Sequence, residues 1–372
     1  MKWTEPKCGS SKANQAGKIL AGRKAPNENM SWEQAFDLAG NWRSSHGYPL
    51  QVMYMTLRNR ARKIEPKALV AQRQKRIPSI IAKLKRFHGM QLGQMQDLGG
   101  CRAVVKSPRK VERLVKLYEE RPCKSAQLCE KYDYIKNPKE DGYRGIHLVY
   151  RYHSLEEKRS RYNGRRIEIQ IRSLLQHGWA TAVETIDTFT GQAIKSGIGS
   201  EHWKRFFMLI GSFIALVEKR KLVPGTPSDR AKWFEELYSL ITRLNVANVF
   251  RGLHAGLDLF PKVPRGSKYT ILVLDSQQRV TTMYSFGNER DAAIRYLEIE
   301  KEKANNPAVQ AVMVSVDSVR ALRQAYPTYY LDTAGFLGTV EGFMRGVPKH
   351  EETDGTGNVR RGHEQYSFRF PS

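Results

Sequence analysis

Cysteine is scarce in this 372-residue chain, which contains only Cys8, Cys101, Cys123 and Cys129. Four scattered cysteines are too few for a disulfide scaffold, and no Cys-x-x-Cys pair or paired histidine spacing indicates a zinc site. Long apolar runs are also missing, because none approaches the roughly 18 residues of a membrane span. The first six residues lack the basic-then-apolar order of a signal peptide. We therefore expect a cytoplasmic protein with reduced thiols, without zinc and without membrane association.

Acidic residues are outnumbered, since 37 Asp and Glu stand against 62 Lys and Arg, for a formal charge of +25. Residues 1–200 carry a net charge of +20 and residues 201–372 a net charge of +5. The stretch 51–110 holds 15 basic residues and only two acidic ones, Glu65 and Asp97. Ordinary solvated lysine and arginine account for part of this excess, but such a field is typical of proteins that bind a polyanion. We expect a nucleic acid among the partners.

Periodicity and turn residues predict a mixed α/β (α+β) protein. The polar first thirty residues are expected to be loosely ordered, and Asn29 or Ser31 is expected to cap the next helix. Tyr48-Pro49-Leu50 is interpreted as a helix break. In Arg165–Arg172, Ile167, Ile169 and Ile171 alternate with polar residues, so Glu168 and Gln170 should share one face of a strand. The predicted helices are 32–46, 51–63, a stretch from Pro78 and Ser79 to Leu84, 108–121, 173–188, 201–219 and 230–250; the predicted strands are 103–105, 132–135, 146–152 and 165–172.

Turn residues at 260–267 predict a linker between a domain at 1–260, with basic N-terminal helices, and a module at 261–347. The module should contain strands at 269–275, 279–286 and 309–316, helices at 288–304 and 317–325, and a short apolar helix ending at Phe343. This order is typical of a small α+β fold. The tail 348–372 is expected to be disordered.

Two carboxylates flank a basic and aromatic loop. Alone, Asp97 before Gly99 and Gly100 would be a turn or cap residue, and Glu168 would be an exposed strand charge. Between them, cations surround Tyr143, which offers an aromatic face for a base, and a second group of cations lies around a predicted helix start, where phosphates bind well. These cations are Lys136, Lys139, Arg144 and His147 in the loop, and Arg73, Lys75, Lys83 and Arg86, with the hydroxyl of Ser79, upstream. The pattern indicates transfer from a nucleoside triphosphate.

The ordered blocks resemble the synthetase domain of RelA/SpoT homologues over roughly residues 50–190. The resemblance is carried by Arg73-x-Lys75-x-x-x-Ser79-x-x-x-Lys83, Asp97-Leu98-x-Gly100-x-Arg102, Asp133-Tyr134-Ile135-x-x-Pro138-Lys139-x-x-Gly142-Tyr143-Arg144-x-x-His147 and Glu168-x-Gln170-Ile171-Arg172. It implies a mixed-sheet, nucleotidyltransferase-like domain flanked by helices. It also implies that pyrophosphate passes from ATP to a ribose 3′-hydroxyl.

The resemblance further implies roles for single residues. Asp97 and Glu168 would be catalytic and hold Mg²⁺, and Glu168 would also act as the base for the 3′-hydroxyl or orient it. ATP would be bound by Arg73 and Arg102 at the adenine and by Lys75, Ser79 and Lys83 at the phosphates. The acceptor would be bound by Tyr143, Lys139, Arg144, His147 and Gln170, with its base stacked on Tyr143.

Three departures from the family pattern bear on the acceptor. Tyr132 stands where a lysine is usual, Asp141 where an asparagine is usual, and Gly145 where a serine is usual. An acid at Asp141 would repel the 5′-phosphates of a free nucleotide. The departures therefore favour an acceptor other than a free guanine nucleotide.

The overall plan resembles the fused toxic small alarmone synthetases of the CapRel-like type, which combine toxin and antitoxin in one chain. This implies that the C-terminal module blocks the synthetase until a phage protein releases it, and that the acceptor is the CCA end of tRNA. Tyr326-x-x-Tyr329 resembles the element that such modules place near the ATP site, although both tyrosines are equally compatible with core packing.

Three hypotheses remain from the sequence. The first is an autoinhibited tRNA 3′-end pyrophosphokinase. The second is an enzyme that makes free alarmones from GDP, GTP or adenine nucleotides. The third is a non-catalytic RNA-binding or phage-sensing protein, which the pair of Asp97 and Glu168 disfavours, since a binding protein gains nothing from two carboxylates in a basic groove.

Overall fold

The computed structural model describes residues 3–190, 200–251, 263–275, 280–303, 309–315 and 329–346. The chain divides into two compact units. The first unit comprises Met1–Asn137 and Arg144–Leu174, and the second comprises Pro138–Tyr143 and Leu175–Ser372. Of the predicted linker at 260–267, residues 263–267 are described and include a turn at Arg265 and Gly266. The domain boundary at residue 260 lies outside the described residues and stays a prediction.

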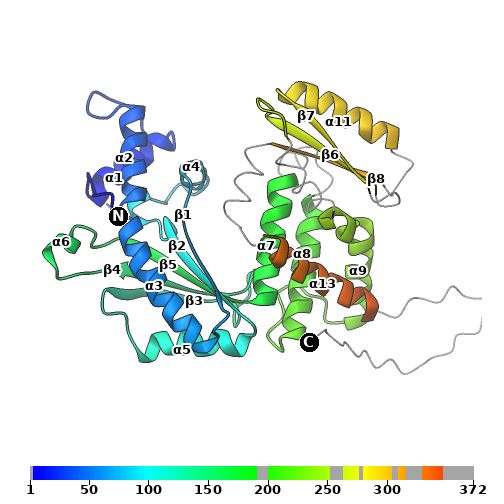
Figure 1. Cartoon of the computed structure of the whole chain (residues 1–372), viewed down its shortest axis with the longest axis horizontal. Coiled ribbons are helices and arrows are strands. Elements are labelled where there is room, and N and C mark those ends of the chain that lie inside the picture. The colour runs from blue at the N-terminus through cyan, green and yellow to red at the C-terminus, as the bar shows by residue number, and fades with distance from the viewer. Residues whose placement is uncertain are drawn as a thin grey trace, which may run out of the picture. The chain divides into compact units, whose positions relative to one another are not determined.

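A five-stranded mixed sheet forms the centre of the first unit, which confirms the predicted fold class (Figure 1). Its strands, in spatial order, are β1 (Leu69–Gln74), β2 (Gly99–Val105), β5 (Arg166–Ser173), β4 (Ile146–Tyr152) and β3 (Ala126–Asp133). Strands β2 and β5 run parallel, and the other neighbouring pairs are antiparallel. The parallel pair brings the residues after Asp97 next to the strand that carries Glu168.

One face of this sheet is apolar and is covered by two helices (Figure 1). Ile167, Ile169 and Ile171 point to this face, as the alternation in the sequence predicts. They pack with residues of α3 (Gly47–Ile64) and α5 (Pro108–Glu120). Because side chains alternate along a strand, the polar residues of β5 must lie on the opposite face.

The N-terminal region is ordered, which corrects the expectation of a loose first thirty residues. Helix α1 (Ser10–Leu20) packs with α2 (Trp32–Ser44) and α4 (Ile77–Arg86) in a shared apolar cluster. Three of its five buried residues, Ala13, Ala16 and Gly17, are small, and a Cβ on Gly17 would lie 2.8 Å from Leu92 Cβ at the 3₁₀ turn η1 (Leu92–Gln94). Small residues permit this close packing but contribute little to a hydrophobic pattern, so α1 could not be predicted from the periodicity of the sequence.

Several predicted boundaries also need correction. Ser31 caps α2 in a reciprocal arrangement with Gln34, which decides between Asn29 and Ser31. Pro49 does not break a helix, because it lies in the first turn of α3, where its missing N–H costs no intrahelical hydrogen bond. Strand β3 begins six residues earlier than predicted, and β1 was not predicted at all. A short helix, α6 (Glu157–Ser160), lies in the β4–β5 connection.

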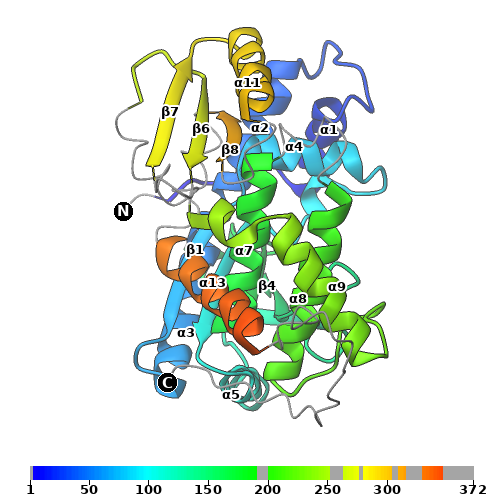
Figure 2. The same ribbon diagram turned by 90° about the vertical axis from the view of Figure 1, so that its right-hand side faces the viewer.

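Helices form the body of the second unit (Figure 2). These are α7 (Leu174–Thr190), α8 (Ser200–Val217), α9 (Arg230–Arg243) and the C-terminal α13 (Tyr329–Gly346). The ring of Phe336 lies 6.2 Å from that of Phe206, and the ring of Phe343 lies 5.0 Å from that of Phe213. Phe336 and Phe343 are fully buried in the same core as residues of α7, α8 and α9. Helix α13 is thus part of this core.

Between α9 and α13 the chain forms a small antiparallel sheet in the order β7 (Val280–Phe286), β6 (Tyr269–Asp275) and β8 (Val309–Ser315). Helix α11 (Glu289–Lys303) packs on it through Ala292 and Ile299 (Figure 2). These elements confirm the predicted strands and helix of the α+β module. The predicted helix at 317–325, Tyr326 and the tail 348–372 lie outside the described residues. In the part of the chain that the structure describes, no helix is long and apolar enough to cross a membrane.

Candidate active site

The face of the five-stranded sheet opposite α3 and α5 carries two rows of residues in register, and we call it the polar face. Residues that pair across neighbouring strands lie on the same face, so the rows bring together side chains that are distant in the sequence. The first row is Arg73, Gly100, Glu168, Val149 and Glu130, and the second is Ala71, Arg102, Gln170, His147 and Tyr132. The prediction that Glu168 and Gln170 share a face is confirmed.

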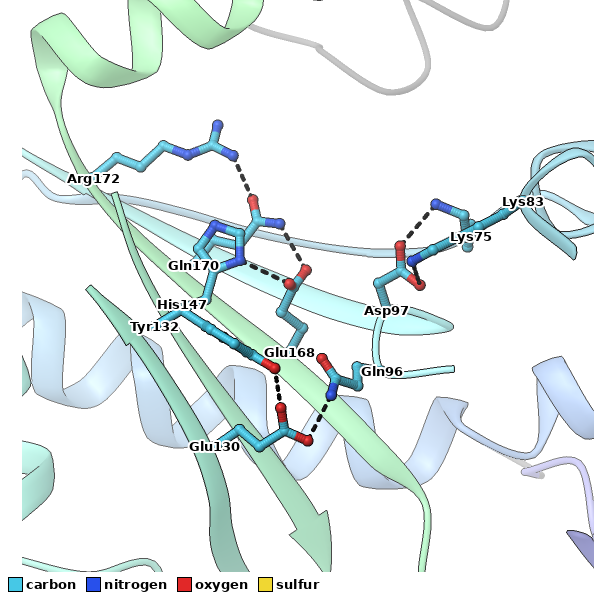
Figure 3. Close-up of polar contacts among 10 residues, drawn as sticks. All are labelled: Lys75, Lys83, Gln96, Asp97, Glu130, Tyr132, His147, Glu168, Gln170 and Arg172. Atoms are coloured by element: carbon cyan, nitrogen blue, oxygen red, sulfur yellow. Dashed lines mark hydrogen bonds and ion pairs between the residues drawn. The ribbon is translucent and has the colours of Figure 1, made fainter. Parts of the chain in front are cut away.

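Asp97 lies in the turn before β2, and each oxygen of its carboxylate bonds a lysine (Figure 3). Lys75 Nζ lies 2.8 Å from Oδ2, and Lys83 Nζ lies 3.0 Å from Oδ1. Burial raises the pKa of Asp97, but the two ammonium groups outweigh it, so the pKa lies below its ordinary value. The structure therefore brings together three residues that the sequence assigned to the metal and the ATP phosphates.

Glu168 is bound by an imidazole and a side-chain amide, whereas Asp97 is bound by two lysines. His147 Nδ1 lies 2.8 Å from Oε1, and Gln170 Nε2 donates to Oε2 at 2.7 Å (Figure 3). Burial raises the pKa of Glu168 and the charge of Asp97 also raises it, but the bonds from His147 and Gln170 outweigh both, so the pKa lies below its ordinary value. An ionised carboxylate in a largely buried position is suited to accept a proton or to bind a cation.

Arg172 extends this chain of hydrogen bonds, because its Nη2 donates to Gln170 Oε1 at 2.7 Å. This bond fixes the amide of Gln170 so that its NH₂ group faces Glu168. Arg172 was not among the predicted site residues, although it lies two residues beyond Gln170 on the same strand face. The period of two that identified Glu168 and Gln170 also pointed to Arg172.

A second group of polar residues near the site was missed. Glu130 on β3 accepts a hydrogen bond from Gln96 at 2.6 Å and another from the hydroxyl of Tyr132 (Figure 3). Gln96 directly precedes Asp97, so this contact ties the turn that carries Asp97 to the edge strand. Tyr132 also stacks on Tyr134, with ring centroids 5.8 Å apart. No local pattern links Gln96 to Glu130, which lie 34 residues apart.

Of the predicted adenine and phosphate residues, Lys75 and Lys83 contact Asp97. Arg73 on β1 is exposed, and Arg102 on β2 is half-buried in the neighbouring row of the polar face. Ser79 is in the first turn of α4, where free backbone N–H groups favour an anion. The side chain of Lys83 projects from the same helix to Asp97.

The predicted acceptor residues are divided between the units. His147 and Gln170 contact Glu168 in the first unit, where Arg144 is also buried. Lys139 and Tyr143 lie in the segment Pro138–Tyr143, which belongs to the second unit. We call this segment the acceptor loop.

Internal contacts shape the acceptor loop. Lys139 Nζ lies 5.2 Å from the ring centroid of Tyr143. The Lys139 N–H donates to the Tyr143 carbonyl at 3.3 Å, and the Gly142 N–H donates to the Lys139 carbonyl at 3.0 Å. Asp141 accepts the Tyr143 N–H at 2.8 Å, so its side chain helps to shape the loop backbone.

The donor set fits a magnesium ion that arrives with a nucleotide. Among the described residues, no group of three or more His, Cys, Asp or Glu side chains could hold a metal ion. Asp97 and Glu168 instead supply two ionised carboxylates, close enough for the charge of one to affect the other. Mg²⁺ is commonly held by one or two carboxylates together with phosphates and water.

The chain was compared with known proteins and with solved structures. The chain is similar in structure to small alarmone synthetase 1 of Bacillus subtilis, with 23% identity and a TM-score of 0.40 over 47% of this chain and 89% of that one. It is also similar to small alarmone synthetase 2 of Bacillus subtilis, with 17% identity and a TM-score of 0.40 over 50% of this chain and 94% of that one. A third similar structure is a GTP pyrophosphokinase family protein of Streptococcus pneumoniae, with 23% identity and a TM-score of 0.39 over 50% of this chain and 89% of that one. A search of curated proteins finds no match. Residues 72–187 match the family described as "Region found in RelA / SpoT proteins", so this part of the chain contains that region.

Proposed function

We propose that this protein is an ATP-dependent pyrophosphokinase that modifies the 3′-hydroxyl of the tRNA CCA end, and that it acts as an autoinhibited toxin in phage defence. The observation that carries the enzymatic part is the ionised Glu168, held by His147 and Gln170 beside the lysine-bound Asp97. Pyrophosphate transfer requires a base and a cationic phosphate site that lie close together in the folded protein.

In the proposed reaction, the acceptor 3′-oxygen attacks the β-phosphorus of ATP in line with the departing AMP. The new bond joins the 3′-oxygen to the β-phosphorus, and the bond from the β-phosphorus to the α–β bridging oxygen breaks. Glu168 takes the hydroxyl proton, while His147 and Gln170 hold its carboxylate in place. Lys75 and Lys83 bind the triphosphate oxygens. Asp97 and Glu168 would hold Mg²⁺, which would supply charge neutralisation at the transferred phosphates.

The surface charge of the first unit supports an RNA acceptor. Arg62 and Lys63 are exposed at the end of α3, and Lys85 and Arg86 are exposed at the end of α4. The guanidinium of Arg86 lies 5.3 Å from the ring of Phe87, which is 47% exposed. Exposed cations beside an exposed aromatic ring are typical of single-stranded RNA contacts.

Arg60 is excluded from this RNA-binding set by its contacts. Its guanidinium lies 4.1 Å from the centroid of the Tyr118 ring, and it donates a hydrogen bond to the Arg121 carbonyl. Arg60 therefore packs α3 against α5. Replacing Arg62, Lys63 and Lys85 with glutamine should weaken tRNA binding, with the salt slope of log K reduced by about 0.7 to 0.9 for each lost phosphate contact. ATP binding should stay unchanged, and equal loss of both would contradict an RNA role for these residues.

Alarmone synthesis from free nucleotides is the second candidate function. Lys139 over the Tyr143 ring supports it, because an ammonium beside an aromatic face also suits the phosphates and base of a free nucleotide. The two candidates share the donor and differ only in the acceptor.

Labelled ATP separates the two candidates. ATP carrying label at the γ-phosphate is incubated with the protein and either deacylated tRNA or GDP, GTP and ATP, and the products are resolved by size. Periodate-oxidised tRNA, which lacks the 3′-hydroxyl, is the matched control acceptor, and Glu168→Gln is the control variant. We expect label in intact tRNA alone, whereas label confined to nucleotides would contradict the tRNA proposal.

Autoinhibition by the C-terminal part is a separate component of the proposal. Tyr326 lies outside the described residues, and Tyr329 is the first residue of α13. Full-length Tyr326→Ala/Tyr329→Ala should be toxic on expression, and the added Glu168→Gln change should abolish the toxicity. A soluble but harmless double variant would argue against these tyrosines as the inhibitory element. Deleting residues 261–372 is a poorer test, because it removes Phe336 and Phe343 from the helical core.

A further inference from the structure

We propose that Gly211 on α8 and Trp179 on α7 are positioning residues for the acceptor loop, which they hold through direct backbone and ring contacts. The inference rests on the proposed role of Tyr143 and Lys139 in binding the acceptor, whichever acceptor the enzyme uses. Residues 179 and 211 have no place in the sequence pattern of the site.

The first support is a contact between two glycines. Gly142 has a φ of +97°, and a Cβ on it would lie 2.8 Å from the Phe207 carbonyl oxygen and 3.0 Å from the Trp179 ring. A Cβ on Gly211 would lie 3.0 Å from the Gly142 carbonyl oxygen and 3.2 Å from the Gly142 Cα. The backbone of the loop therefore lies directly against the backbone of α8, and only glycine permits this approach on either side.

The second support is Trp179, which is only 4% exposed. Its indole N–H donates to the Phe207 carbonyl at 2.8 Å, at the same turn of α8 that the loop touches. Its ring is edge-on to that of Tyr143, with centroids 6.2 Å apart. Trp179 thus links the ring that would stack the acceptor base to the helix that supports the loop.

These contacts have a consequence for binding. The loop brings Lys139 and Tyr143 together, and its Gly142 is its point of contact with α8. A methyl group at residue 211 must push Gly142 away by some tenths of an ångström, since both of the closest atoms are backbone. Small misplacement of binding groups reduces reactivity strongly, so the displaced loop should bind its acceptor less well.

The test uses the full chain with Gly211→Ala, the milder Trp179→Phe, and Gly338→Ala as the matched control. Gly338 is an exposed helical glycine on α13, with nothing within 4 Å of an added Cβ. Hydrogen exchange of segment 138–143 is compared with that of β4, and affinities are measured for labelled deacylated tRNA, labelled GTP and a non-hydrolysable ATP analogue.

For Gly211→Ala we expect exchange of segment 138–143 to rise about tenfold or more, with β4 unchanged. The affinity for the acceptor that the wild type binds should fall about tenfold, with the ATP analogue unaffected. Trp179→Phe should show the same change to a smaller extent, which keeps the test decisive if Gly211→Ala fails to fold, and Gly338→Ala should match the wild type.

Unchanged exchange in segment 138–143, or an unchanged acceptor affinity in both variants, would overturn the positioning role. If the wild type binds GTP and not tRNA, the tRNA proposal fails while the positioning role is tested with GTP. If the wild type binds neither probe, the proposed acceptor role of the loop fails and the positioning role falls with it.

Discussion

Asp97 and Glu168 belong to neighbouring regions of the first unit, yet their carboxylates are kept ionised by different means. The Asp97 region is cationic, with Lys75 and Lys83 each bonded to one oxygen. Around Glu168 the direct partners are an imidazole and an amide. Mobile lysine side chains can transfer to phosphate oxygens, whereas the partners of Glu168 are fixed on β4 and β5 and keep their place. We therefore expect the first region to bind phosphate and the second to take part in proton transfer.

The largest expected effect comes from removing the charge of each carboxylate in turn, which distinguishes the Asp97 region from the Glu168 region. Glu168→Gln should lower kcat by about 10²- to 10⁴-fold, because the amide cannot accept the hydroxyl proton. Its affinity for the ATP analogue should fall less than that of Asp97→Asn, because only Asp97 also contacts the two lysines. The measurement is steady-state kinetics beside calorimetric titration. Equal losses of ATP analogue affinity in Glu168→Gln and Asp97→Asn would contradict different roles for the two regions.

Substitution of Lys75 and Lys83 tests the Asp97 region through its cations instead of its carboxylate. Lys75→Met and Lys83→Met keep the aliphatic length and remove the charge, so each should weaken ATP analogue binding about tenfold or more. Acceptor affinity should remain near that of the wild type, because the Glu168 region keeps its contacts. Loss of acceptor binding with intact analogue binding would reverse our assignment of the two regions.

A smaller effect is expected when one partner of Glu168 is removed. Gln170→Ala deletes a hydrogen bond that favours the ionised carboxylate, so the pKa of Glu168 should rise. The acid limb of the kcat profile should then move to higher pH, with Lys75→Met as the control that leaves this bond intact. A profile that falls in amplitude without moving would mean that Gln170 acts only on the geometry of the site.

The smallest effect concerns stability against acid. The folded pKa of Asp97 lies below its ordinary value of 3.8, so the stability it contributes is present above that pH and is lost as the pH falls through the folded pKa. The urea midpoint of the wild type should therefore exceed that of Asp97→Asn by about 0.3 M at pH 6. The gap should close below pH 3.8. A gap that is constant with pH would mean that the ion pairs with Lys75 and Lys83 do not depend on the charge of Asp97.

Local patterns were sufficient for much of the architecture. Alternation in Ile167, Ile169 and Ile171 predicted β5 and the shared face of Glu168 and Gln170, because a strand repeats every two residues. The strands of the small sheet were placed within one residue. Helix α1 and the role of Pro49 were misjudged, because both depend on position within a helix and on packing more than on hydrophobicity.

Contacts between distant residues could not be predicted in the same way. The bond from Gln96 to Glu130 depends on the register of β3 against β4, and a bulge at Leu128/Glu130 alters that register. The burial of Phe336 and Phe343 beside Phe206 and Phe213 depends on the return of α13 to the helices that precede the small sheet. Neither arrangement leaves a periodic signal in the chain.

The sequence by itself determined which residue types carry the chemistry, since Asp97, Glu168 and the lysines occur in ordered motifs with short internal spacing, and it determined most strands and helices through their periods. Only the tertiary structure decided that Lys75 and Lys83 both bind Asp97, that His147 and Gln170 share Glu168, and that Gly142 lies on Gly211. The physical reason is that local backbone preferences act over a few residues, whereas these contacts arise from strand register and helix packing, which depend on how the whole unit closes around its core.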